Sequence, residues 1–229
     1  MVKHVGIIAV SFEGAALCYR TFCQEAMALA GNLSHPEVSL HNHSLKLYMD
    51  CIEGSDWNGV ADLMVSSAGK LAAAGVDFAV CPDNTVHRVF DRVAKESPVP
   101  LLSIIDVVSD ECKRRGYGKV GVLGTKYTMQ GPMYRDALAK RHIEMAVPDA
   151  KDQDRVNSVI FEELVPEGVT KSSVEALIDV VQKLKDAGCE AVVLGCTELP
   201  LVLNVGNSPL PVVDSTRLLA LKALEYALK

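Results

Sequence analysis

Residues 190–200 read EAVVLGCTELP, an apolar run that ends in a polar turn. Residues 77–87 read DFAVCPDNTVH and follow the same plan, and in both places a helix end of the form Ala-Gly-x-acid leads into the run. Each half also has an earlier glycine-containing run, VGIIAVS near residue 5 and VGVLGT near residue 120. Both features repeat at a spacing of about 115 residues, which indicates an internal duplication. The sequence therefore predicts two similar lobes.

Short apolar runs alternate with helical patterns along the whole chain. Further strands are expected at 101–105 and 211–213. Because such strands alternate with helices, the predicted fold class is α/β, with two pseudo-symmetric lobes, each a mostly parallel sheet flanked by helices. The predicted lobes are 1–100, completed by 208–229, and 101–207. Apolar residues three and four apart mark the expected helices, at 58–74, 86–95, 106–115, 129–141, 171–187 and 218–228.

Composition and charge exclude several classes of protein. Apolar residues make up 49% and charged residues 23%, as in globular proteins. The net charge of −6 includes no basic run, so no nucleic-acid partner is expected. No apolar stretch reaches the roughly 18 residues that span a bilayer, and the run from Val5 to Val10 is too short for a signal peptide. The seven cysteines form no C-x-x-C pair, so we expect a cytoplasmic protein without a membrane partner.

The two polar turns form the expected ligand site. Ligands of open α/β sheets bind beyond the carboxyl ends of the strands, so two facing lobes would place residues 84–85 and 196–197 on opposite walls of one cleft. Cys196 ends a buried run, where backbone N–H groups and a helix N-terminus would lower the pKa of its thiol. Thr197 offers a hydroxyl group to a carboxylate. The alternative interpretation of Cys196 is a structural cysteine at a strand end.

The turn of the first half, PDNTVH at 82–87, supplies a different set of groups. Asn84 and Thr85 carry an amide and a hydroxyl suited to an anion, and Asp83 is the ionisable side chain that faces the second turn. The alternative is that one of these residues caps the next helix, a role compatible with binding a carboxylate. His87 is expected to begin or cap that helix.

Six segments, in a fixed order and spacing, carry a resemblance to a known family. They are GII at 6–8, SFEG at 11–14 with Tyr19-Arg20 following, CPDNTVH at 81–87, LGTKYTM at 123–129, IFEEL at 160–164 and GCTE at 195–198. Over essentially its full length the chain resembles the aspartate/glutamate racemase superfamily. The resemblance implies two α/β lobes, a homodimer, and catalysis with neither pyridoxal phosphate nor a metal. It also implies two cysteines on opposite faces of the substrate α-carbon, one removing a proton and the other returning one.

The chain departs from the family pattern mainly in its first half. Position 83, where the family has its first cysteine, is Asp, and Cys81 lies two residues too early to replace it. The N-terminal G-G-M-S/G pattern is reduced to Ala-Val-Ser at 9–11. The segment that is rich in carboxylates in many relatives reads HNHSL at 41–45. The family motif of the second half of the chain is therefore intact, and that of the first half is altered.

The resemblance and the turns together predict an enzyme, an isomerase. The expected reaction is racemisation of an acidic amino acid, such as aspartate or glutamate, by cofactor-independent removal and return of the α-proton. Cys196 and Asp83 are the expected acid/base pair, because a carboxylate near a substrate carboxylate has a raised pKa. Hydroxyl, amide and backbone donors would stabilise the carbanion as an oxyanion hole does. The expected substrate-binding residues are Ser11, Asn84, Thr85, Tyr127, Thr128 and Thr197.

Two other classes of protein remain open. A family member with only the second cysteine resembles decarboxylases of substituted malonates, in which that cysteine protonates the carbanion on one face. Isomerases of cis-unsaturated diacids use a nucleophilic cysteine at the first position, which is Asp83 here. The other class is a non-catalytic protein that binds a small dicarboxylate. His41 and His43 have the spacing of a metal-binding pair, but no third ligand is nearby in sequence, so no metal is expected.

Overall fold

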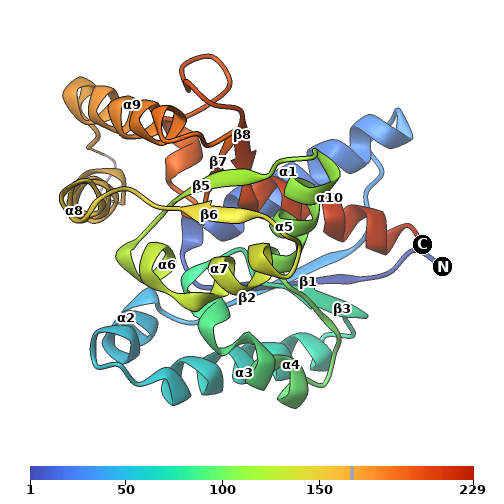
Figure 1. Cartoon of the computed structure of the whole chain (residues 1–229). Coiled ribbons are helices and arrows are strands. Elements are labelled where there is room, and N and C mark those ends of the chain that lie inside the picture. The colour runs from blue at the N-terminus through green and yellow to red at the C-terminus, as the bar shows by residue number, and fades with distance from the viewer. Residues whose placement is uncertain (166–167) are drawn as a thin grey trace. The chain divides into compact units, whose positions relative to one another are not determined.

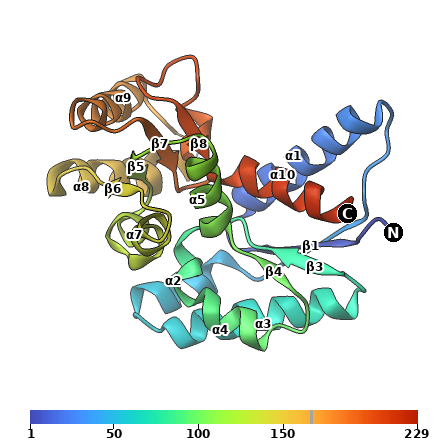
Figure 2. The same ribbon diagram turned by 45° about the vertical axis from the view of Figure 1, so that its right-hand side comes forward.

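The computed structural model describes residues 1–165 and 168–229, which form two compact units. The first unit comprises Met1–Val107 and Thr216–Lys229, and the second comprises Val108–Ser215. Each unit contains one four-stranded sheet in which all paired strands are parallel, with helices against it (Figure 1, Figure 2). The predicted α/β fold with two similar parallel sheets is confirmed.

The first unit has the strand order β2-β1-β3-β4. The chain leaves this unit within helix α5 and returns to it within helix α10. Its elements are β1 (Val5–Ala9), α1 (Phe12–Ala30), β2 (Val38–Asn42), α2 (Leu45–Glu53), α3 (Trp57–Ala73), β3 (Phe78–Val80), the 3-10 helix η1 (Thr85–Val89), α4 (Phe90–Glu96), β4 (Leu101–Leu102), α5 (Ile104–Arg114) and α10 (Ser215–Ala227).

The second unit has the equivalent strand order β6-β5-β7-β8. Its elements are β5 (Lys119–Leu123), α6 (Lys126–Gln130), α7 (Pro132–Ala139), β6 (Glu144–Ala146), α8 (Ala150–Ser158), the π-helix η2 (Val159–Leu164), α9 (Lys171–Asp186), β7 (Ala191–Leu194), the 3-10 helix η3 (Leu199–Leu201) and β8 (Val212–Asp214). Within the part of the chain that the structure describes, no helix is both long and apolar enough to cross a membrane.

The duplication seen in the sequence is repeated in the backbone of the two units. Gly75 and Gly188 end the helices before β3 and β7 with φ of 84° and 86°, a left-handed conformation that glycine adopts without steric cost. The acidic residue two positions later has the same task in both units. Asp77 Oδ2 accepts a hydrogen bond from the His4 amide, and Glu190 Oε2 accepts one from the Lys119 amide. Each carboxylate thus joins the start of a central strand to its neighbour.

Glycine in the first strand of each unit lets a helix approach the sheet closely. A Cβ atom added to Gly6 would lie 3.2 Å from Leu71 Cδ1 on α3, and one added to Gly121 would lie 2.7 Å from Leu184 Cδ1 on α9. The central strands are buried, as expected when helices cover a parallel sheet. Their carboxyl ends are therefore fixed by a packed core.

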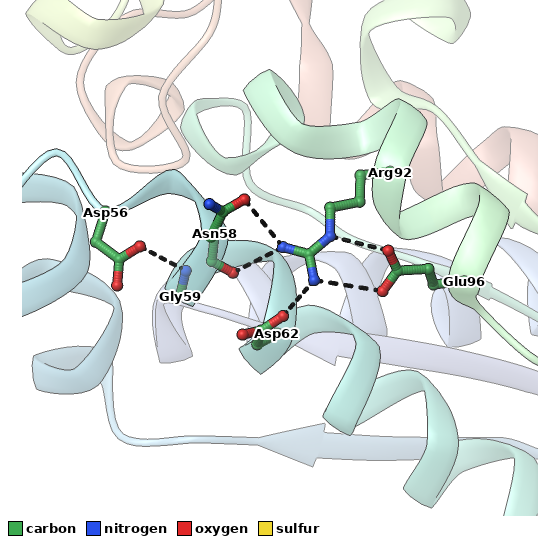
Figure 3. A network of polar contacts seen from close by, with 6 residues as sticks. All are labelled: Asp56, Asn58, Gly59, Asp62, Arg92 and Glu96. Carbon is green, nitrogen blue, oxygen red and sulfur yellow. Dashed lines mark hydrogen bonds and ion pairs between the residues drawn. The ribbon is translucent and has the colours of Figure 1, made fainter.

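Helices α3 and α4 of the first unit are held together by polar contacts, shown in Figure 3. The Arg92 guanidinium on α4 donates to the backbone oxygen and the side-chain Oδ1 of Asn58, both at 3.2 Å, and it also pairs with Asp62 and Glu96. One turn earlier, the Arg88 guanidinium lies 4.4 Å from the centre of the Trp57 ring. These contacts fix the helical segment that follows the turn at residues 82–85.

Several element boundaries differ from those predicted. The strand expected at 101–105 is only Leu101–Leu102, because Ser103 Oγ accepts a hydrogen bond from the Asp106 amide and begins α5. The helix expected at 129–141 is interrupted at Gly131-Pro132, where proline cannot continue the hydrogen-bond pattern of α6. The sequence patterns predict neither α1 nor α8, although each helix has a typical N-cap residue. Ser11 caps α1, and Asp149 caps α8.

The units also divide the chain at points other than the predicted lobes 1–100 with 208–229 and 101–207. Leu101 pairs with Ala79 of β3, so residues 101–107 belong to the first unit. Val212–Asp214 pairs with β7, so residues 208–215 belong to the second unit. In each unit the last strand is thus an edge strand beside the strand that carries the polar turn.

Candidate active site

The turn after β7 surrounds a thiol with polar groups. Cys196 lies two residues after the end of β7, and only 8% of it is exposed. Its Sγ donates a hydrogen bond to Glu198 Oε2 at 2.9 Å, and Thr197 Oγ1 donates to the same oxygen at 2.8 Å. Glu198 itself is 5% exposed, so its carboxylate is nearly removed from water. The Cys196 thiol is therefore hydrogen-bonded to a buried carboxylate.

Glu198 is the residue of this turn that sequence reasoning did not include among the site residues. The signal was present, because Glu198 is the last letter of the GCTE motif. We expected a helix N-terminus to lower the pKa of the thiol, but the helix that follows is the short 3-10 turn Leu199–Leu201. The polar environment of Cys196 thus comes from a side-chain carboxylate and not from a helix dipole.

Two glycines bring the strand ends of the second unit together beneath Cys196. A Cβ atom added to Gly124 would lie 2.8 Å from the Gly195 carbonyl oxygen, and one added to Gly195 would lie 3.0 Å from Thr128 Cγ2. The Gly195 amide donates to the Leu123 carbonyl at 2.7 Å. Larger residues at either position would push the turn away from β5, so these glycines position Cys196.

Two of the predicted substrate-binding residues, Tyr127 and Thr128, follow β5, and Thr128 also has a structural role. Thr128 is fully buried, and its hydroxyl lies 3.3 Å from Thr125 Oγ1, which also accepts from the Thr128 amide and caps α6. Tyr127 is half-buried on the same helix. Next to β7, Ser215 Oγ donates to the Leu194 carbonyl at 2.7 Å and joins the end of that strand to the start of α10.

The turn after β3 presents a carboxylate. Asp83 is half-buried, and its Oδ1 accepts a hydrogen bond from the Val86 amide at 3.2 Å, as the capping alternative predicts. Asn84 is 3% exposed, and its carbonyl accepts from the His87 amide. Thr85 is half-buried and begins η1. The side chain of Asp83 therefore caps the 3-10 helix with one oxygen.

Asp83 and Cys196 occupy equivalent positions of the internal repeat. Asp83 comes six residues after Asp77, and Cys196 comes six residues after Glu190. Cys81 is a poor substitute for a reactive group in the first turn. It is 4% exposed, and burial, followed by the charge of Asp83, raises the pKa of its thiol well above the ordinary value.

His41 and His43 lie at the end of β2 with their ring centres 4.7 Å apart. Their rings contact the hydroxyls of Ser67 and Ser66, and burial and the charge of Lys70 lower the pKa of both rings. Among the described residues no three or more His, Cys, Asp or Glu side chains are grouped so that they could hold a metal ion. Ser11, after β1, accepts from the Gly14 amide and caps α1.

Comparison with known proteins identifies the family. The model of the Asp/Glu/Hydantoin racemase family matches residues 5–223. The chain belongs to this family. A crystal structure of a Yersinia pestis protein proposed to be an Asp/Glu racemase has a TM-score of 0.91 at 34% identity, over 99% of this chain and 100% of that one. An aspartate racemase homologue from Pyrococcus horikoshii OT3 has a TM-score of 0.86 at 32% identity, over the whole of both chains.

A curated relative of this racemase family is the broad specificity amino-acid racemase RacX of Bacillus subtilis. It is 26% identical over 199 residues, which are 87% of this chain and 85% of the relative. Within each unit of this family member, the predicted site residues follow the carboxyl ends of neighbouring strands. In the first unit they are Ser11, Asp83, Asn84 and Thr85, and in the second they are Tyr127, Thr128, Cys196 and Thr197.

Proposed function

We propose that this protein is an amino-acid racemase that acts on an acidic amino acid such as aspartate or glutamate without a cofactor. Family membership supports this reaction class. The observation that carries the proposal is the hydrogen bond from Cys196 Sγ to the buried Glu198 carboxylate, at a position of the repeat equivalent to Asp83. One repeat thus supplies a thiol and the other a carboxylate, and both are groups that exchange protons with carbon acids.

Racemisation needs two proton transfers at the same carbon atom. In one direction, the Asp83 carboxylate removes the α-proton and becomes a carboxylic acid. The Cys196 thiol then gives its proton to the opposite face of the carbanion and becomes a thiolate. In the other direction the roles are exchanged, so that the thiolate removes the proton and protonated Asp83 returns one. In the substrate only the α C–H bond breaks and re-forms, while on the protein an O–H bond forms on Asp83 and the S–H bond of Cys196 breaks, and no electrons are gained or lost.

Glu198 lies within hydrogen-bond distance of the Cys196 thiol and can exchange a proton with it. When the thiol donates to the carboxylate, Cys196 can act as the acid. If the proton passes to Glu198, the sulfur becomes a thiolate and can act as the base. The Thr197 hydroxyl supports the carboxylate in both forms, because it donates to the same Glu198 oxygen.

The half-buried residues of the turns have the exposure that contact with a substrate requires. Thr85 and Tyr127 are half-buried. The residues that bear the Thr197 hydroxyl and the Asn84 amide directly follow the two acid/base groups in the sequence. Ser11 and Thr128 already bond the backbone or a neighbouring hydroxyl, so we assign them to holding the strand ends as well as to binding. Donors of this kind would stabilise charge on the substrate carboxylate as the carbanion forms.

The experiment is to incubate the purified protein separately with the L and D forms of aspartate and glutamate, and to separate the enantiomers by chiral chromatography. We expect at least one of the two amino acids to be converted in both directions, in the presence of EDTA and without added pyridoxal phosphate. Failure of all four substrates to change configuration would contradict the proposal.

A second candidate is a one-cysteine decarboxylase of substituted malonates. The observation that favours it is the hydrogen bond from the Val86 amide to Asp83, because a carboxylate that caps a helix can be purely structural. In that reaction the carbanion arises from loss of CO₂, and Cys196 protonates it on one face. Formation of a single enantiomer from a prochiral malonate, with no change in any amino acid, would select this reaction.

A further inference from the structure

His87 lies in the 3-10 helix that follows Asp83 and is 4% exposed. Its ring nitrogens have two backbone partners on different elements. Nδ1 lies 2.6 Å from the Asp83 carbonyl oxygen, and Nε2 lies 3.2 Å from the Ile104 amide nitrogen, at the start of α5. The ring also stacks on Phe90, with centres 5.0 Å apart and planes 7° from parallel. The imidazole therefore bridges the Asp83 turn and α5 inside the first unit.

The partners determine the proton positions on this ring. A backbone amide can only donate, so Nε2 accepts from Ile104 and carries no hydrogen. A carbonyl oxygen can only accept, so Nδ1 carries the hydrogen and donates it to Asp83. His87 is thus neutral and in a single tautomer. Burial lowers its pKa to about 4, while the Asp83 carbonyl and the Asp106 carboxylate on α5 act in the opposite direction.

The backbone around Asp83 is consequently held at three points. The Asp83 carbonyl accepts from the His87 ring, the Asp83 side chain accepts from the Val86 amide, and the Asn84 carbonyl accepts from the His87 amide. The first of these contacts also links the turn to α5, because the same His87 ring accepts from the Ile104 amide.

We propose that His87 is a positioning residue of the reaction, which fixes the direction of the Asp83 carboxylate by tying the Asp83 carbonyl to the Ile104 amide. This inference rests on the proposed function, in which Asp83 exchanges a proton with the substrate. Both ring nitrogens are occupied by the backbone, so His87 itself exchanges no proton with the substrate. Small displacements of a reacting group cost rate more than they cost substrate binding.

The test compares three variants of the full chain. His87→Phe keeps an aromatic ring on Phe90 but removes both hydrogen bonds. His87→Gln is the conservative variant, because its side-chain amide supplies both a donor group and an acceptor. His35→Phe is the matched control, since His35 is exposed in the loop before β2. For each we would measure kcat and KM for aspartate and glutamate, the pH–rate profile, and hydrogen exchange at the Ile104 and Val86 amides.

In His87→Phe we expect kcat to fall about tenfold or more with KM changed by less than about threefold, together with faster exchange at both amides. His87→Gln should recover most of the rate and the exchange protection, with both limbs of the pH–rate profile in place, and His35→Phe should match the wild type. If His87→Phe does not fold, His87→Gln alone carries the test, through the pH–rate profile and the two amides.

Three results would overturn the inference: wild-type kcat and exchange in His87→Phe, loss of a pH limb in His87→Gln, or a reduced kcat with unchanged exchange at Ile104. A wild-type protein that racemises neither amino acid contradicts the proposed function instead. In that case the exchange measurements still report whether His87 holds the turn.

Discussion

The turns after β3 and β7 occupy the same place in two copies of one fold, yet they carry different chemistry. Each turn follows a buried strand. The acidic residue just before that strand accepts a hydrogen bond from a backbone amide at the start of the neighbouring strand. The first turn then presents Asp83, half-buried and bonded to a backbone amide. The second presents Cys196, nearly buried and bonded to the Glu198 carboxylate. The scaffold has been kept through the duplication while the reactive ends have diverged.

The packing beneath the turns differs as well. In the second unit Gly124 and Gly195 allow two strand ends to approach closely. The corresponding positions in the first unit are Ala9 and Pro82. Thus the thiol turn is held by close backbone contact, and the carboxylate turn is held by side-chain hydrogen bonds. The comparison suggests that each reactive group needs its own means of positioning, and this can be tested residue by residue.

The largest effect is expected from Cys196→Ser. A hydroxyl is a far weaker acid than a thiol, so racemisation should fall by at least about a hundredfold in kcat. The melting temperature should change little because the two side chains are similar in size. Cys51→Ser, at a half-buried position on α2, serves as the control. Turnover near the wild-type value in Cys196→Ser would end the assignment of this turn as reactive.

Asp83→Asn tests the other turn. The amide keeps the shape of the side chain, and its oxygen can still accept from the Val86 amide, but it cannot carry the proton. Racemisation should therefore collapse, by roughly the hundredfold typical of a lost acid/base, while α-deuterium exchange through Cys196 persists with retention of configuration. Asp91→Asn, on the first turn of α4, is the control. Unchanged racemisation in Asp83→Asn would reduce Asp83 to a capping residue.

Glu198→Gln separates the two turns further, since the thiol–carboxylate hydrogen bond that it changes belongs to the second turn. Glutamine can accept from Thr197 and Cys196 but cannot take up the thiol proton. We expect kcat to fall about tenfold, with a smaller change in KM and a shifted limb in the pH–rate profile. A wild-type profile would show that Glu198 serves only to pack the turn.

Gly124→Ala tests the close approach that holds the thiol turn. The new Cβ would meet the Gly195 carbonyl oxygen at 2.8 Å, and backbone atoms cannot move aside as a side chain can. We expect a loss of about 2 kcal/mol in the free energy of unfolding together with reduced turnover. Gly69→Ala on α3 is the control, because nothing lies within 4 Å of its added Cβ, and it should leave stability unchanged or raise it.

The smallest effect concerns His87 and pH. Its pKa is lowered from 6.5 to about 4 in the folded protein, so between these values the unfolded chain binds the additional proton. Stability from this group is fully present above pH 6.5 and is lost as the pH falls. Between pH 7 and 5.5 the wild type should lose about 1 kcal/mol more than His87→Gln, as measured by urea unfolding. Equal losses would mean that His87 is not buried in its neutral form.

Much of the fold could be predicted because the duplication is written in short, local signals. Gly75 and Gly188 mark helix ends, and Asp77 and Glu190 mark the strand starts that follow, so the sequence places β3 and β7 in both halves. Single residues that change an element were harder to read. Ser103 converts the expected strand 101–105 into a helix start, and its hydroxyl gives no signal until its partner amide is known.

The sequence could propose residues for the candidate site but not their contacts. Cys196 and Asp83 stand at equivalent points of the repeat, which sequence spacing alone indicates. The bond from Cys196 to Glu198 depends on the rotamers of two side chains in a turn, and no spacing rule specifies them. The bridge through His87 depends on Ile104, 17 residues further along the chain. Such contacts follow from tertiary packing, which lies beyond a local pattern.

The central claim is that two different groups, Cys196 and Asp83, handle the proton on the two faces of one α-carbon. The most direct test is to start the reaction from one pure enantiomer of the amino acid in D₂O and to measure deuterium in both enantiomers at low conversion. Each group carries a single exchangeable proton, so the product should contain deuterium at the α-carbon and the remaining substrate should contain almost none. Equal labelling of substrate and product would show that one group serves both faces, and would contradict the account.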